Sequence, residues 1–109
     1  MTDLSLSDRV EIHVRDFYQL PVEKVAVMLP TFLAVLKNHL NDLETALDGG
    51  DLIGIGRVGH TLKGALLNLG LAEIAEIAAS IEREGKLGGE NFDFTEAVSR
   101  LKVELQEIL

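Results

Sequence analysis

The chain has 109 residues, 47% of them hydrophobic, with a formal net charge of −8 and no cysteine. This length allows a single core, so we expect residues 1–109 to form one domain. The absence of cysteine excludes disulfides and thiolate metal sites. The acidic balance argues against nucleic acid as a partner, because binding to phosphates needs clustered lysine and arginine.

The sequence also argues against a membrane segment. Residues 1–16 mix charges of both signs and contain no apolar stretch, so we expect no signal peptide. The most apolar run, residues 25–36, is interrupted by Pro30 and is too short to span a bilayer. We therefore expect a soluble cytoplasmic protein. The initiating Met1 and a final helix reaching Leu109 favour a free-standing protein, although a fragment would give the same pattern.

The first two predicted helices cover the N-terminal half. One runs over residues 6–19, capped by Ser5 or Ser7 and stopped by Pro21. Its expected inward residues are Val10, Val14, Phe17 and Tyr18. The second covers residues 22–47, with apolar residues at a period near 3.6 throughout. Proline lacks an N–H and clashes with the preceding turn, so Pro30 should kink or divide this helix.

Three further helices follow at short intervals. The third covers residues 52–69, with Asp51 ready to cap it, and the fourth covers residues 71–84 and ends at Gly85. The fifth begins after Asp93 in a capping-box pattern and runs to residue 109. Short connections favour antiparallel packing. We predict an all-α fold, an up-down-up-down four-helix bundle with an additional N-terminal helix.

The stretch GIGRVGHTLKG, residues 54–64, contains two overlapping patterns. Residues 54–59 have the G-x-G-x-x-G spacing of dinucleotide-binding turns. That spacing indicates a nucleotide site only after a strand and within a βαβ unit. Here it follows the turn-like GGDLI and precedes an alanine-rich helix, so we reject it. A P-loop fails as well, because Ala65 stands where lysine is required.

A helical wheel places His60 on the surface. The residues that must face the core are Ile55, Val58, Leu62, Leu66 and Leu69. His60 falls ~150° from the middle of this stripe at ~100° per residue. A lone surface histidine ordinarily has no function, so its neighbours decide the interpretation.

Those neighbours make an open, positively charged setting. Helical side chains lean toward the N-terminus, so glycine at position 64, one turn after His60, leaves the imidazole accessible. Gly56, one turn before His60, is expected on the same exposed face, where the absence of a side chain reduces the bulk beside the imidazole. Arg57 and Lys63 supply positive charge at i−3 and i+3.

The exposed apolar residues and the glycines of this helix also require an explanation. Exposed Ile53 and Leu67 flank His60 along the axis, which suggests a partner surface. Each mid-helix glycine costs roughly 1 kcal/mol relative to alanine. Close helix packing explains Gly59, whereas the sequence offers no reason for Gly54.

The chemistry favours an incoming anion. No serine or cysteine is placed for His60 to activate, and no acidic residue lies at i±3 or i±4 to orient it. A metal site is disfavoured because His13 and His39 lie on other helices, among charged neighbours where we expect both to be solvated. Neutral imidazole is a nucleophile near pH 7, and a phosphoryl group on it would be stabilised by Lys63. We hypothesise phosphohistidine formation.

Residues 60–64, His-Thr-Leu-Lys-Gly, followed by Gly70, resemble the H-x-[LI]-K-G…G signature of histidine-containing phosphotransfer (HPt) domains. The similarity extends from about Phe32 through Asp51 to Glu82 in AASIE, and more loosely over nearly the whole chain. The expected helix order agrees with the bundle of this family.

The resemblance implies a phosphorelay intermediate. His60 would accept a phosphoryl group, at Nε2, from a receiver-domain phosphoaspartate or a sensor histidine kinase, and pass it to a receiver aspartate. Lys63 would stabilise the phosphoryl oxygens and Gly64 would give clearance. The receiver would bring Mg²⁺, so this chain would bind no cofactor or metal, and it would have no ATP-dependent kinase activity. The residues expected to dock the partner are Ile53, Gly56, Arg57, Leu67 and Asn68.

Two alternatives stay open at this stage. The first is a helical docking module whose His60 is never phosphorylated, since a fold does not fix a function. The second is a metal- or cofactor-binding bundle. It is disfavoured because bundle metal sites use inward-facing pairs of glutamate and histidine, and we find no such pairs in this sequence. The apolar stripes fit inside one bundle, so we expect a monomer. The acidic residues of the fourth helix, Glu73, Glu76, Glu82 and Glu84, are expected on a solvated face.

Overall fold

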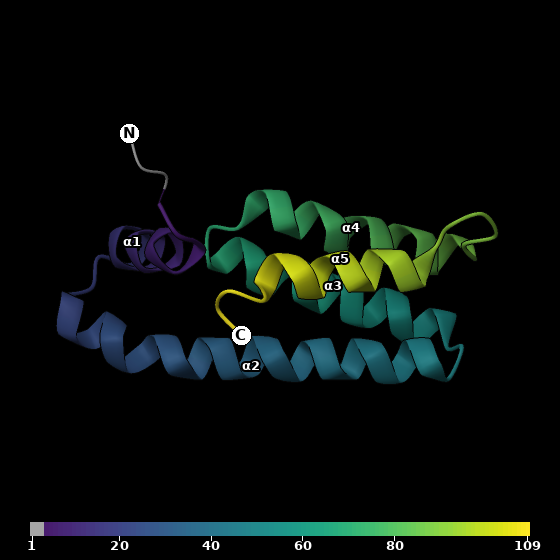
Figure 1. Cartoon of the computed structure of the whole chain (residues 1–109), viewed down its shortest axis with the longest axis horizontal. Helices are drawn as coiled ribbons and strands as arrows, with labels where there is room; N and C mark the ends of the chain where they lie inside the picture. The colour runs from purple at the N-terminus through teal and green to yellow at the C-terminus, as the bar shows by residue number, and fades with distance from the viewer. Residues whose placement is uncertain (1–3) are drawn as a thin grey trace.

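The computed structural model describes residues 4–109. The described part is all-helical, with α1 (Leu6–Tyr18), α2 (Val22–Asp48), α3 (Leu52–Asn68), α4 (Ala72–Leu87) and α5 (Phe94–Leu105). In Figure 1, α2, α3, α4 and α5 lie along the length of a molecule of 45 × 29 × 19 Å, and α1 is seen nearly end-on beside one end of α2. The all-α prediction is confirmed.

Side-chain caps fix the start of three helices. Ser5, Asp51 and Asp93 each accept a hydrogen bond from the backbone N–H three positions further on. These bonds satisfy donors that the first helical turn leaves without partners. The cap of α3 also explains Gly54, whose N–H lies 3.0 Å from Asp51 Oδ1. A Cβ on residue 54 would contact the same carboxylate.

Helix α2 is a single helix through Pro30, so of the predicted kink or division at this residue the division does not occur. Pro30 lies on the exposed side of α2. There, water can bond the carbonyl group that the missing proline N–H leaves without a partner.

Helix α4 extends past its predicted end at Gly85, as far as Leu87. Gly85 is buried inside the helix, and the left-handed conformation that ends α4 occurs at Gly88 (φ 91°). The mistake arose because a glycine needed for packing has the same sequence signal as a glycine that ends a helix. Helix α5 ends at Leu105, earlier than residue 109.

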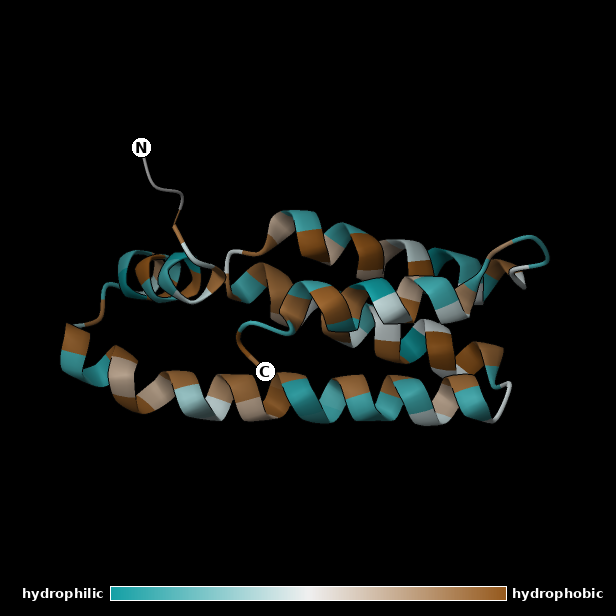
Figure 2. Cartoon of the chain, in the orientation of Figure 1, coloured by the Kyte–Doolittle hydropathy of each residue, from teal (hydrophilic) through white to brown (hydrophobic). Residues whose placement is uncertain are grey.

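The core is built from one apolar stripe on each helix, and Figure 2 shows these residues as bands that alternate with polar ones. Its fully buried large side chains include Leu36, Leu43, Ile55, Leu62, Leu66, Leu71, Ile81, Leu101 and Leu105. Two aromatic residues of α1 were predicted inward but are exposed, Phe17 by 66% and Tyr18 by 40%. Phe17 instead stacks on His13, with ring centroids 5.3 Å apart. His13 is therefore not the freely solvated residue that we expected.

No single helix among residues 4–109 is long and apolar enough to cross a membrane. Helices α1 and α2 reach that length and composition only when they are combined across a bend of 117°.

Candidate functional site

His60 lies near the middle of α3, on the side away from the core. Its side chain is 66% exposed, whereas Ile55, Leu62 and Leu66 of the same helix are buried. The orientation expected from the helical wheel is therefore present in the structure.

A carboxylate from another helix orients this histidine, although no acidic residue lies at i±3 or i±4 on its own helix. Glu82 of α4 places Oε2 2.6 Å from His60 Nδ1. Glu82 is only 8% exposed, so the prediction of a solvated Glu82 is wrong. Two lysines also donate hydrogen bonds to it: Lys63 Nζ to Oε1 at 2.7 Å, and Lys86 Nζ to Oε2 at 3.0 Å.

The lysines keep Glu82 ionised. Hydrogen bonds from Lys63, then from Lys86, lower the pKa of Glu82 from 4.5 to about 2, and they outweigh the opposing effect of burial. An ionised carboxylate only accepts hydrogen bonds, so neutral His60 must carry its proton on Nδ1. Nε2 then has a free lone pair, and Nε2 is the nitrogen not engaged by Glu82.

Close packing of α3 against α4 brings Glu82 to His60. A Cβ on Gly59 would lie 2.9 Å from the backbone nitrogen of Glu82, and a Cβ on Gly85 would lie 2.8 Å from Gly56 Cα. Only glycine permits backbones to approach this closely. The packing role predicted for Gly59 agrees with this contact.

Gly56 was predicted on the exposed face, among the partner-docking residues, and this prediction is wrong. Gly56 is buried, and a Cβ there would contact the Glu82 carbonyl oxygen at 3.4 Å. The helical wheel placed Gly56 beside His60, but α4 covers this part of the helix. Gly56 thus faces α4 and cannot form part of an exposed surface.

The outward face of α3 is open and positively charged. Apart from its chain neighbours and the adjacent backbone of α3, an added Cβ on Gly64 would have no atom of the described chain within 4 Å, so the space beside it is open. Arg57 is exposed, and α3 contains Arg57 and Lys63 but no acidic residue. In a chain of net charge −8, this helix is suited to meet an anion or an acidic partner.

The other predicted docking residues are exposed on this helix. Ile53 is 74% exposed and Leu67 49% exposed, and Asn68 at the end of α3 is also exposed. The structure therefore brings together His60, Lys63, Gly64, Arg57 and these three residues on α3, and it removes Gly56 from the set.

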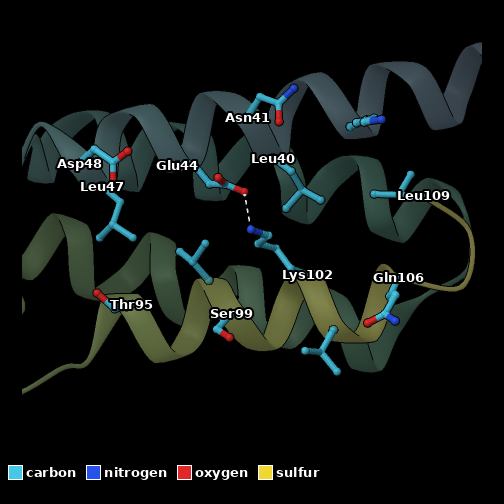
Figure 3. Close-up of a pocket in the computed structure, with 13 residues that line it drawn as sticks. Leu40, Asn41, Glu44, Leu47, Asp48, Thr95, Ser99, Lys102, Gln106 and Leu109 are labelled. Atoms are coloured by element: carbon cyan, nitrogen blue, oxygen red, sulfur yellow. Dashed lines mark ion pairs between the residues drawn. The ribbon is translucent and has the colours of Figure 1, made fainter.

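Away from His60, a hollow lies between α2 and α5, with a volume of about 610 Å³ (Figure 3). It contains no histidine, and an ion pair of 3.1 Å between Lys102 and Glu44 spans it. Among residues 4–109, no group of three histidine or acidic side chains is placed to hold a metal ion. His60 and its surroundings are therefore the candidate site.

Sequence reasoning missed Glu82 and Lys86, because both come from α4. A signal was nevertheless present: Glu82 follows buried Ala75 and Ala78 at helical spacing, on the face that packs against α3. A carboxylate at a core-facing position requires a charged or hydrogen-bonding partner. Lys86, four residues after Glu82, was the nearest candidate on the same helix.

The model of the Hpt domain family matches residues 27–109, which include α3, α4 and α5 and most of α2. The chain belongs to the Hpt domain family. Membership implies a part in two-component phosphorelay signalling, in which these domains interact with receiver domains and kinases. Helix α1 lies outside the matched residues. Comparisons with curated proteins and with solved structures give no significant match.

Proposed function

We propose that this Hpt domain carries a phosphoryl group on His60. The group would come from the phosphoaspartate of a receiver domain or from a sensor histidine kinase, and would pass to a receiver aspartate. One observation carries the proposal: on an exposed side chain, His60 Nδ1 lies 2.6 Å from Glu82 Oε2, so in the neutral imidazole the proton sits on Nδ1 and Nε2 has the lone pair.

The transfer to His60 requires the imidazole ring, the Glu82 carboxylate and the phosphoryl donor. The lone pair of His60 Nε2 attacks phosphorus in line, an N–P bond forms, and the P–O bond to the donor aspartate breaks, releasing its carboxylate. Nδ1 keeps its proton, so the imidazole ring becomes positively charged. The hydrogen-bonded carboxylate of Glu82 stabilises that charge and holds the ring in orientation. The return of the phosphoryl group to a receiver reverses these steps.

The neighbouring residues contribute position and charge. Lys63 adds positive charge beside the phosphoryl group while it holds Glu82, and Gly64 leaves room for the partner to approach. Arg57, Ile53 and Leu67 contact the partner, together with Asn68. The acidic site of a receiver suits this basic face, and the receiver supplies the Mg²⁺, so the chain itself holds no cofactor or metal.

We also propose that α2 to α5 form an up-down-up-down bundle, with α1 as an additional N-terminal helix. The short turns between these helices and the reversing colour gradient in Figure 1 support this arrangement. We further propose that the protein acts in the cytoplasm as a monomer and has no ATP-dependent kinase activity.

The test mixes the purified chain with a ³²P-phosphorylated receiver domain, with His60→Gln as the control variant. We expect label on the chain that survives alkali, is lost in acid and is absent from the variant. If several receivers and kinases transfer no label to the parent chain, the proposal is contradicted. That result would favour a docking module, for which Ile53 and Leu67 would be the next residues to change.

A further inference from the structure

A hollow of about 520 Å³ lies beside His60, between α3 and the last turns of α4. Its lining residues are Ile53, Arg57, His60, Thr61, Gly85 and Lys86. The lysine of the sequence motif, Lys63, is not among them. The hollow therefore contains two cationic side chains that the motif does not include, Arg57 of α3 and Lys86 of α4.

The two lysines that bind Glu82 differ in their surroundings. Lys63 bonds Oε1 at 2.7 Å, and its side chain is 31% exposed. Lys86 bonds Oε2 at 3.0 Å, and its side chain is 65% exposed. Oε2 is also the atom that accepts the bond from His60, so Lys86 and His60 are held by one oxygen.

The polar groups around this hollow suit phosphoryl oxygens. Lys86 provides an ammonium group and Arg57 a guanidinium group, both of which form charge-assisted hydrogen bonds with phosphate. The Thr61 hydroxyl donates to the Arg57 carbonyl oxygen at 3.3 Å, a long bond that can be exchanged for a better acceptor.

We infer that this hollow binds the phosphoryl group of phosphorylated His60, with Lys86 as the lysine that contacts its oxygens directly. This inference rests on the function proposed above. Lys63 is a positioning residue, because it holds Glu82 from the less exposed side and thereby fixes the His60 ring. When the phosphoryl group arrives, Lys86 leaves Oε2 for the phosphoryl oxygens, while Lys63 remains on Oε1 and keeps Glu82 in place.

The test compares Lys86→Gln, Lys86→Arg and Lys63→Gln in the full chain, using phosphoramidate as a small phosphoryl donor that needs no protein docking. Lys102→Gln is the matched control, since Lys102 forms a similar exposed ion pair with Glu44 at 3.1 Å. The readouts are the rate of phosphohistidine formation and the half-life of the phosphorylated protein. A charge-assisted hydrogen bond made only as the phosphoryl group arrives is worth roughly tenfold or more in rate.

We expect Lys86→Gln to slow formation at least roughly tenfold and to shorten the half-life, with Lys86→Arg restoring most of both and Lys102→Gln changing neither. Lys63→Gln should disturb the His60 ring instead, seen as altered imidazole NMR shifts before any phosphorylation. If Lys86→Gln behaves as the parent chain while Lys63→Gln loses the phosphoryl group, this inference is overturned and the proposed function stands. If the parent chain takes no phosphoryl group from the donor or from any receiver, both fail.

Discussion

Two faces of α3 contain glycine for opposite reasons. On the face that packs against α4, the place of a Gly59 side chain is taken by the Glu82 backbone, 2.9 Å from an added Cβ. On the outward face, an added Cβ on Gly64 would meet nothing within 4 Å. The first glycine is required by the fold of this chain. The second is not required by any contact within the described chain.

The two glycines serve different purposes: Gly59 is needed for stability, whereas Gly64 leaves His60 accessible. A mid-helix glycine that the fold does not need costs roughly 1 kcal/mol relative to alanine. The openness beside Gly64 therefore points to a group from outside the chain, at the position one turn after His60 that a side chain would cover. The packed face has a functional consequence as well, because the contact at Gly59 brings Glu82 within reach of His60.

The largest effect is expected on the packed face, from Gly59→Ala. A methyl group 2.9 Å from backbone atoms forces α3 and α4 apart, and such overpacking costs about 1–3 kcal/mol, beyond the gain in helix propensity. We expect a net loss of about 1–2 kcal/mol in the free energy of unfolding, measured by urea denaturation. Phosphoryl acceptance should fall with it, because Glu82 moves with α4. A variant as stable as the parent would show that the close approach is not needed.

The contacts of Glu82 with Lys63, Lys86 and His60 form an ion-pair network beside the packed face. This network should make the free energy of unfolding depend on pH. The pKa of Glu82 is lowered from 4.5 to about 2 in the folded chain, so its contribution to stability is present above about pH 4.5 and is lost as the pH falls toward about 2. Urea unfolding of the parent chain and of Glu82→Gln should therefore differ most near neutral pH and converge in acid.

The control for that experiment is Glu76→Gln, an exposed change on the same helix that removes one negative charge without touching the network. Equal stability of the parent chain and Glu82→Gln at neutral pH would contradict the network that the structure describes.

The outward face should give the opposite pattern in Gly64→Ala. The added methyl group meets no neighbouring atom, so we expect the free energy of unfolding to rise by about 0.5–1 kcal/mol. Transfer from a phosphorylated receiver should nevertheless slow by roughly tenfold, because the methyl group lies beside the imidazole that the partner must reach. Rapid-quench transfer assays and thermal unfolding measure the two effects. Unchanged transfer in a stabilised variant would remove the access explanation.

The smallest effect on stability is expected at the apolar residues that flank His60. Ile53→Ser and Leu67→Ser change exposed side chains, so the free energy of unfolding should shift by no more than about 0.5 kcal/mol. Binding to the cognate receiver, measured by calorimetry, should weaken in both variants. Val103→Ser is the matched control, because Val103 is 64% exposed on α5, which carries none of the site residues. Equal weakening by the control would show that these residues have no specific role.

Apolar periodicity predicted all five helices and the exposed position of His60, because a 3.6-residue repeat reports which side of one helix is buried. The caps at Asp51 and Asp93 were predicted for a similar reason, since capping involves residues only three apart. Glu82, Lys86 and the true position of Gly56 were not predicted. Each depends on how closely α4 approaches α3, a distance that no single-helix pattern contains.

The exposure of Phe17 and Tyr18 was missed on similar grounds. Both follow the apolar stripe of α1, but α1 lies beside one end of α2, where neighbouring helices leave these two side chains partly uncovered. Apolar spacing identifies a face suited to burial, and neighbouring elements decide whether that face is covered.

The most direct measurement is NMR of the ¹⁵N-labelled chain after phosphorylation by a receiver domain, reading which ring nitrogen is bonded to phosphorus. We predict phosphorus on Nε2 of His60, with a proton retained on Nδ1 and hydrogen-bonded to Glu82. Phosphorus on Nδ1 of His60, on His13 or His39, or on no histidine at all would contradict this account.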